Sequence, residues 1–166
     1  DYSTISGGLR NISAAPYSTV SGGYTNSSGD FYSTVSGGSS NSAGGYGATV
    51  SGGVANSANA QEATVAGGGG NTASADYATV SGGSNNSATA IGSAITGGTT
   101  NATDGDNSTI LGGQGLTLGA TADYTLGFLS NAGGNEMTID ESSTAVFGNT
   151  NIWLANNTNN PSELRF

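Results

Sequence analysis

A 15-residue unit repeats eight times between residues 2 and 113 without an insertion or a deletion. It begins as YSTISGG at residues 2–8 and ends as NSTILGG at residues 107–113. A strict period of this length is typical of stacked architectures, in which each repeat packs on its neighbours. The chain has 30 Gly among 166 residues and only 8% charged residues. Such a composition is common in disordered segments. A disordered chain has no reason to keep a constant repeat length, however, so we expect an ordered repeat.

One column of the repeat is always Val or Ile. β-branched side chains favour strands, and their presence in every repeat predicts a position that faces the interior. The column two residues earlier is uniformly Ser or Ala, which predicts a narrow interior because alternate strand residues share a face. In the central repeats the inward-facing column is Val20, Val35, Val50, Val65 and Val80.

A Gly-Gly pair follows in every repeat, and an Asn comes three residues after the pair. The pair suits a tight corner that needs positive φ and close approach of the next turn's backbone. Stacked Asn side chains can hydrogen-bond along a ladder. Alternatively, each Asn adopts a left-handed turn conformation and does nothing more. The column comprises Asn11, Asn26, Asn41, Asn56, Asn71, Asn86 and Asn101.

These columns predict an all-β fold, a parallel β-solenoid or β-roll of 15-residue turns over residues 1–115. Eight turns at about 4.8 Å each would form a rod about 38 Å long. From about residue 114 the pattern fades, and Leu116 takes the place of the Asn. Residues 137–140, 143–148 and 151–156 are expected to be strands. We therefore predict a β-rich module over residues 116–166 that caps the solenoid or drives oligomerisation.

The composition argues against several classes of function. Cys, His and Lys are absent, so the commonest zinc ligands and the commonest general base are missing. A net charge of −9 disfavours nucleic acid, and no apolar run approaches the roughly 20 residues of a membrane helix. We predict no enzyme and no catalytic, cofactor-binding or metal-binding residues. The carboxylates scattered around the corners are Asp30, Glu62, Asp76, Asp104, Asp106 and Asp123.

The combination ATVSGG…NSA, repeated, resembles the head repeats of trimeric autotransporter adhesins. The C-terminal segment, residues 143–166, resembles segments of bacterial and phage-like fibre proteins that follow such repeats. The resemblance covers about residues 1–115 and implies a left-handed parallel β-roll in a trimer. It also implies an extracellular, cell-surface or virion-associated fibre, often adhesive, and the family motif contains no catalytic residue.

Two functions follow as hypotheses. The first is a structural or adhesive fibre subunit that associates with itself, as a homotrimer or a head-to-tail filament, and that contacts a host surface or glycan. Its outward Tyr2, Tyr17, Tyr32 and Tyr77 are candidates for further apolar burial. The alternative is an ice-binding solenoid, in which a Thr-x-Ser ladder of stacked hydroxyls on one strand face orders water. That column comprises Thr4, Thr19, Thr34, Thr49, Thr64 and Thr79.

Overall fold

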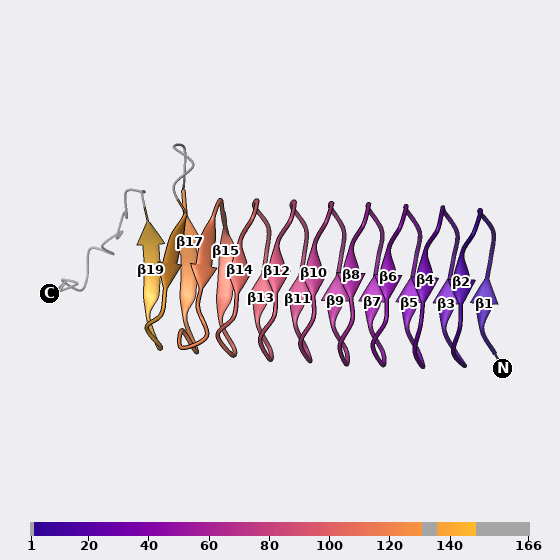
Figure 1. Ribbon diagram of the computed structural model, residues 1–166, viewed down its shortest axis with the longest axis horizontal. Helices are drawn as coiled ribbons and strands as arrows, with labels where there is room; N and C mark the ends of the chain where they lie inside the picture. The colour runs from indigo at the N-terminus through magenta and orange to yellow at the C-terminus, as the bar shows by residue number, and fades with distance from the viewer. Residues whose placement is uncertain (1, 131–135, 149–166) are drawn as a thin grey trace, which may run out of the picture.

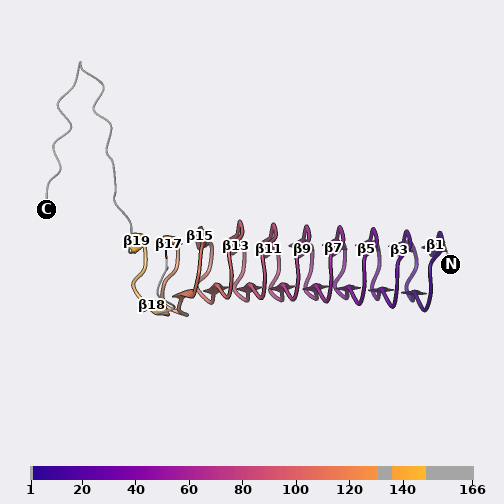
Figure 2. The same cartoon turned by 90° about the horizontal axis from the view of Figure 1, so that it is seen from above.

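The computed structural model describes residues 2–130 and 136–148, and these form a parallel β-solenoid of about nine turns without a helix. The fold class predicted from the repeat is therefore confirmed. Figure 1 shows the turns side by side along one long axis, from β1 at the N-terminal end to β19. Figure 2, from above, shows the same succession of coils in the region of the repeats.

Each turn contributes one strand to each of two parallel sheets. The ten-stranded sheet contains the odd-numbered strands in sequence order: β1 (Thr4–Ile5), β3 (Thr19–Val20), β5 (Thr34–Val35), β7 (Thr49–Val50), β9 (Thr64–Val65), β11 (Thr79–Val80), β13 (Ala94–Ile95), β15 (Thr109–Gly113), β17 (Leu126–Leu129) and β19 (Ala145–Gly148). The nine-stranded sheet contains the even-numbered strands: β2 (Ile12–Ser13), β4 (Ser27–Ser28), β6 (Ser42–Ala43), β8 (Ser57–Ala58), β10 (Thr72–Ala73), β12 (Ser87–Ala88), β14 (Ala102–Thr103), β16 (Leu116–Leu118) and β18 (Met137–Ile139).

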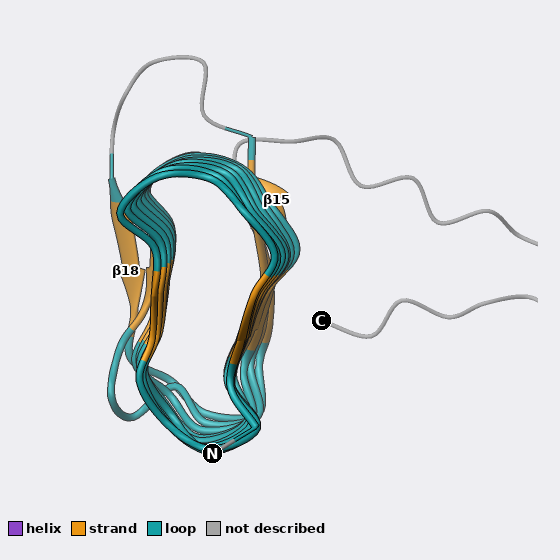
Figure 3. Cartoon of the chain, turned by 90° about the vertical axis from the view of Figure 1, so that its right-hand side faces the viewer, coloured by secondary structure: helices purple, strands orange, loops and turns teal. Residues whose placement is uncertain are grey.

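The register equals one repeat wherever the period is kept. Thr19 pairs with Thr34, and Ser27 pairs with Ser42, so equivalent side chains of successive turns lie directly above one another. A third line of parallel bridges runs along the connection from odd to even strands, from Leu9↔Tyr24 to Thr99↔Gln114. Viewed along the axis, the two sheets face each other and are joined by curved connections at both ends (Figure 3). We call these connections the odd-to-even corner and the even-to-odd corner.

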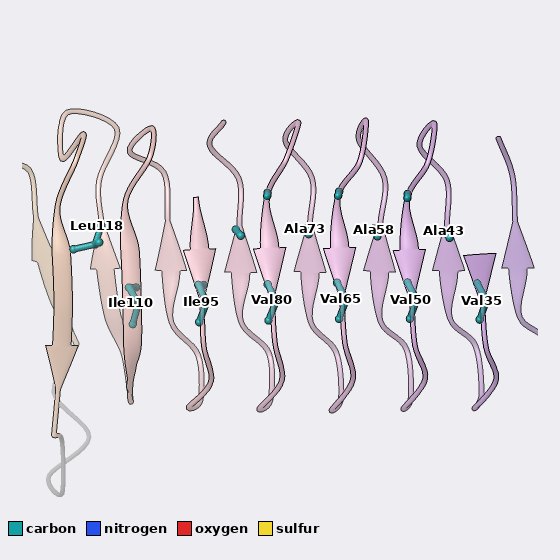
Figure 4. Close-up of a cluster of buried hydrophobic side chains, with 14 of the residues drawn as sticks. Val35, Ala43, Val50, Ala58, Val65, Ala73, Val80, Ile95, Ile110 and Leu118 are labelled. Atoms are coloured by element: carbon teal, nitrogen blue, oxygen red, sulfur yellow. The ribbon is translucent and has the colours of Figure 1, made fainter. Parts of the chain in front are cut away.

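The interior is a narrow column of small and β-branched side chains. Val20, Val35, Val50, Val65 and Val80 are completely buried. Ala43, Ala58, Ala73 and Ala88 face them from the even-numbered strands, also without exposure. Figure 4 shows both rows along the axis, with larger Ile95, Ile110 and Leu118 toward the C-terminal end. Each turn thus packs on the turns before and after it rather than around a common centre.

The solenoid does not end at residue 115, where the sequence pattern fades. Strands β16 to β19 continue the same two sheets, so the described part of the expected C-terminal module is more coil. The spacing changes instead: Thr109 pairs with Leu126, and Leu116 pairs with Met137. Space for the bulkier core comes from Gly127, where a Cβ would lie 3.3 Å from Leu118 Cδ2. The strand expected at 151–156 lies outside the described residues.

Candidate functional site

The Asn column connects successive turns at the odd-to-even corner. Each Asn side chain bonds to backbone, not to the next Asn side chain. Asn86 Nδ2 donates to Gly82 O of its own turn and to Gly98 O of the next turn, both at 3.0 Å. Its Oδ1 accepts from Asn101 N at 3.0 Å. One buried amide thereby satisfies three backbone groups across two turns, as expected of buried polar groups.

The left-handed conformation lies one residue before each Asn. Thr25, Ser40, Ala55 and Asn85 have φ between 55° and 59°. Asn26, Asn41, Asn56 and Asn86 are absent from the residues with positive φ. The alternative explanation for the Asn column, a left-handed turn at the Asn itself, is therefore wrong.

The second glycine of each pair is required by contact as well as by conformation. Gly68 has φ +86°, and a Cβ there would overlap the carbonyl oxygen of Gly83 and lie 2.7 Å from Asn71 Nδ2. At Gly67, the first glycine of the same pair, a Cβ would have no atom within 4 Å. The close approach of neighbouring turns, expected for the pair as a whole, thus depends on its second member.

The Thr column lies on the outer face of the ten-stranded sheet. Thr4, Thr19, Thr34, Thr49, Thr64 and Thr79 pair in register along β1 to β11. Those from Thr19 to Thr79 are partly exposed, and Ala94 interrupts the column before Thr109. The arrangement places hydroxyl groups about 4.8 Å apart along the axis.

Aromatic side chains gather at the even-to-odd corner of the first four turns. Tyr2 stacks on Tyr17 with ring centroids 5.3 Å apart, and Tyr17 stacks on Tyr32 at 5.2 Å. Tyr46 continues the row edge-on at 5.6 Å from Tyr32, and Phe31 lies 6.4 Å from Tyr32. The sequence showed an outward Tyr column, but it gave no sign that Phe31 and Tyr46 from the neighbouring column join it.

Carboxylates occupy the same corner in the later turns. Several accept backbone N–H groups from the preceding turn: Asp76 Oδ1 from Gln61 N at 3.1 Å, and Asp106 Oδ1 from Ile91 N at 3.0 Å. Within residues 2–130 and 136–148, no group of three or more acidic side chains is arranged to hold a metal ion. These carboxylates connect successive turns through their bonds to backbone N–H groups.

Comparisons with known proteins identify no relative of this chain. No family model matches the chain, and a search of curated proteins found no similar sequence. Among the described residues, no helix has the length and apolar character to cross a bilayer. The columns and the register define the chain as a parallel β-solenoid repeat protein.

Proposed function

We propose that this chain is a non-enzymatic structural or adhesive subunit of an extracellular fibre, related in design to the head repeats of trimeric autotransporter adhesins. It would lie at a cell surface or on a virion and assemble with further copies through coil and C-terminal contacts, as a homotrimer or a head-to-tail filament. A host surface or glycan is the proposed external partner.

The observation that carries this proposal is the in-register stacking of equivalent residues along one axis. The Val column, the Asn column and the second glycines serve only to hold each turn on the next. Such a chain presents rows of equivalent surface positions, which suit repeated contacts along a fibre. The exposed aromatic side chains at the even-to-odd corner of the first four turns support self-association, because contiguous apolar patches on a soluble protein mark interaction sites.

Electron microscopy of the purified chain over a range of concentrations tests this proposal. We expect elongated particles whose length or width grows in discrete steps as copies assemble. Compact particles of one copy at every concentration would refute it. Binding to glycan arrays or host cell surfaces would then identify the external partner, with a chain lacking residues 2–46 as a first map of the contact.

Ice binding is the second candidate, and the in-register Thr column on β1 to β11 favours it. Regularly spaced hydroxyls on a flat sheet can order water in a lattice. Replacing Thr49 and Thr64 by Tyr would disrupt the face without touching the core, since both side chains point outward. Thermal hysteresis in the parent chain that is lost in this variant would support the idea, and no hysteresis in the parent chain would remove it.

A further inference from the structure

The aromatic corner comprises Tyr2, Tyr17, Phe31, Tyr32 and Tyr46, and it is an exposed surface of five rings that pack on one another. Other exposed apolar side chains, such as Leu9, Tyr24 and Val54, lie at the odd-to-even corner. The five side chains are between 44% and 72% exposed although they pack on one another. Packing among themselves fixes the rings in place, so little side-chain freedom remains to be lost when a partner covers them. The aromatic corner is therefore an ordered surface that a partner can cover at a small cost in side-chain entropy.

The exposed area suits a pair of identical surfaces. A fully exposed aromatic side chain offers about 200 Å², so the five together present about 500 Å². Two copies that cover each other's aromatic corner would bury about 1,000 Å² from these rings alone, which reaches the lower limit for a specific interface. Because the same patch serves on both sides, the contact would be isologous, related by a two-fold axis.

Charge decides how two copies can align. Along the same corner, the turns after Tyr46 carry Glu62, Asp76, Asp104 and Asp106, followed by Asp123, Asp140 and Glu141. Among the described residues, the only acidic side chain in the aromatic part is Asp30. A parallel pair would place one acidic row directly against the other, and like charges in apposition are unfavourable. An antiparallel pair overlaps only through the aromatic turns and directs the acidic rows away from each other.

We propose that the aromatic corner is the docking surface for a second copy of this chain, bound antiparallel. Stacked Tyr17 and Tyr32 form its centre, and Phe31 and Tyr46 extend it. This inference rests on the proposed self-association and adds a separate contact to it, because an antiparallel two-fold pair is neither a homotrimer contact nor a head-to-tail contact. It leaves the opposite corner and both sheet faces free for further contacts.

Sedimentation velocity over a concentration series tests the surface. The variant is Tyr17→Asn with Tyr32→Asn, since Asn107 already occupies the same column at φ 54° and Asn therefore fits the left-handed backbone there. Tyr77→Asn is the matched control: Tyr77 is 52% exposed in the same column at φ 62°, but it lies in the acidic part. We expect the double variant to raise the dimer dissociation constant at least about tenfold, since central aromatic residues dominate interfaces, and the control to leave it unchanged.

The absence of Cys allows a single label to test the orientation. Ile91→Cys, on the same exposed corner, lies about four and a half turns from the middle of the aromatic span. At about 4.8 Å per turn, dyes on the two copies of an antiparallel pair would be about 40 Å apart. In a parallel pair they would lie within about 20 Å of each other. Energy transfer that corresponds to the shorter distance overturns the antiparallel arrangement.

The outcomes separate this inference from the broader proposal. Assembly that persists in the Tyr17/Tyr32 variant, or that weakens equally in Tyr77→Asn, refutes the aromatic docking surface while the fibre proposal stands. A parent chain that stays monomeric at every concentration refutes both. Circular dichroism melting curves recorded below the parent chain's dimer dissociation constant, where all chains are monomeric, should superimpose for variants and parent and so show that lost association does not come from lost folding.

Discussion

Replacing Asn86 by Ala tests whether the buried Asn column holds successive turns together. The side chain is completely buried and makes three hydrogen bonds to the backbone. The substitution removes the acceptor of Asn101 N and a donor to Gly82 O. Gly98 O keeps another donor, because Ser84 N bonds to it at 3.0 Å. One buried and one partly buried backbone group thus lose the partner that Asn86 supplies, and each such loss costs about 1–3 kcal/mol.

We therefore expect Asn86→Ala to lower the free energy of unfolding by about 3–5 kcal/mol. For a chain of this size that corresponds to a fall in melting temperature of about 6–20 °C. Urea titration followed by circular dichroism measures the free energy, and thermal melting checks it. The loss is large for a single substitution, because Asn101 N donates in a buried bond and Gly82 O accepts in a partly buried one.

The adjacent Asn85 supplies the control. Its side chain is exposed, and its amide donates only to Ser84 Oγ at 3.1 Å. Ala55 occupies the same column at φ 57°, so alanine is already accommodated at this corner. Asn85→Ala should cost at most about 1 kcal/mol. Equal losses in the two variants, or a loss below about 1 kcal/mol for Asn86→Ala, would refute the assignment of the column as the tie between turns.

Three further substitutions have distinct expected outcomes. Gly68→Ala should lower the free energy of unfolding by about 2–5 kcal/mol in urea titration, because it combines left-handed strain with overlap on Gly83. Gly67→Ala is the control and should change the free energy of unfolding by less than about 1 kcal/mol. Similar losses in the two variants would contradict the contact argument. Thr103→Val should raise the melting temperature and increase the free energy of unfolding by about 1 kcal/mol. The reason is that Thr103 Oγ1 is the only buried side-chain oxygen or nitrogen without a hydrogen-bond partner in the described residues. A lower melting temperature would disprove this explanation. Asn86→Asp places a carboxyl group against two carbonyl oxygens, so burial should raise its folded-state pKa above the usual value of about 3.9. The deficit relative to the parent chain should therefore be smallest below pH 4 and widen as pH rises, and a deficit independent of pH would contradict it.

The sequence predicted those features of the fold that depend on one residue type in one column. Val20 and its equivalents indicated the strand and its inward face, and the constant repeat length indicated the parallel register. The Asn column was recognised, but its backbone partners were not. Gly82 and Gly98 become neighbours of Asn86 only after the corner has folded, so no local pattern identifies them.

Two features carried no usable signal. The left-handed positions hold residues as different as Arg10, Thr25 and Tyr77, because their side chains point into solvent and only the backbone is constrained there. The coil beyond residue 115 was also missed. Leu116 replaces the Asn and the strand spacing lengthens, so the period disappears although the ladder continues: Leu116 N still donates to Asn101 Oδ1 at 3.0 Å.

The in-register pairing of equivalent residues also means that the length of this molecule changes in whole units. Removing residues 47–61 would join Tyr46 to Glu62 and leave every later residue in its original column, so that β5 meets β9 as it now meets β7. Removing one residue fewer would move every following Val out of the interior. Recombination between equivalent modules would therefore lengthen or shorten such a rod by about 4.8 Å per module without a new fold having to evolve.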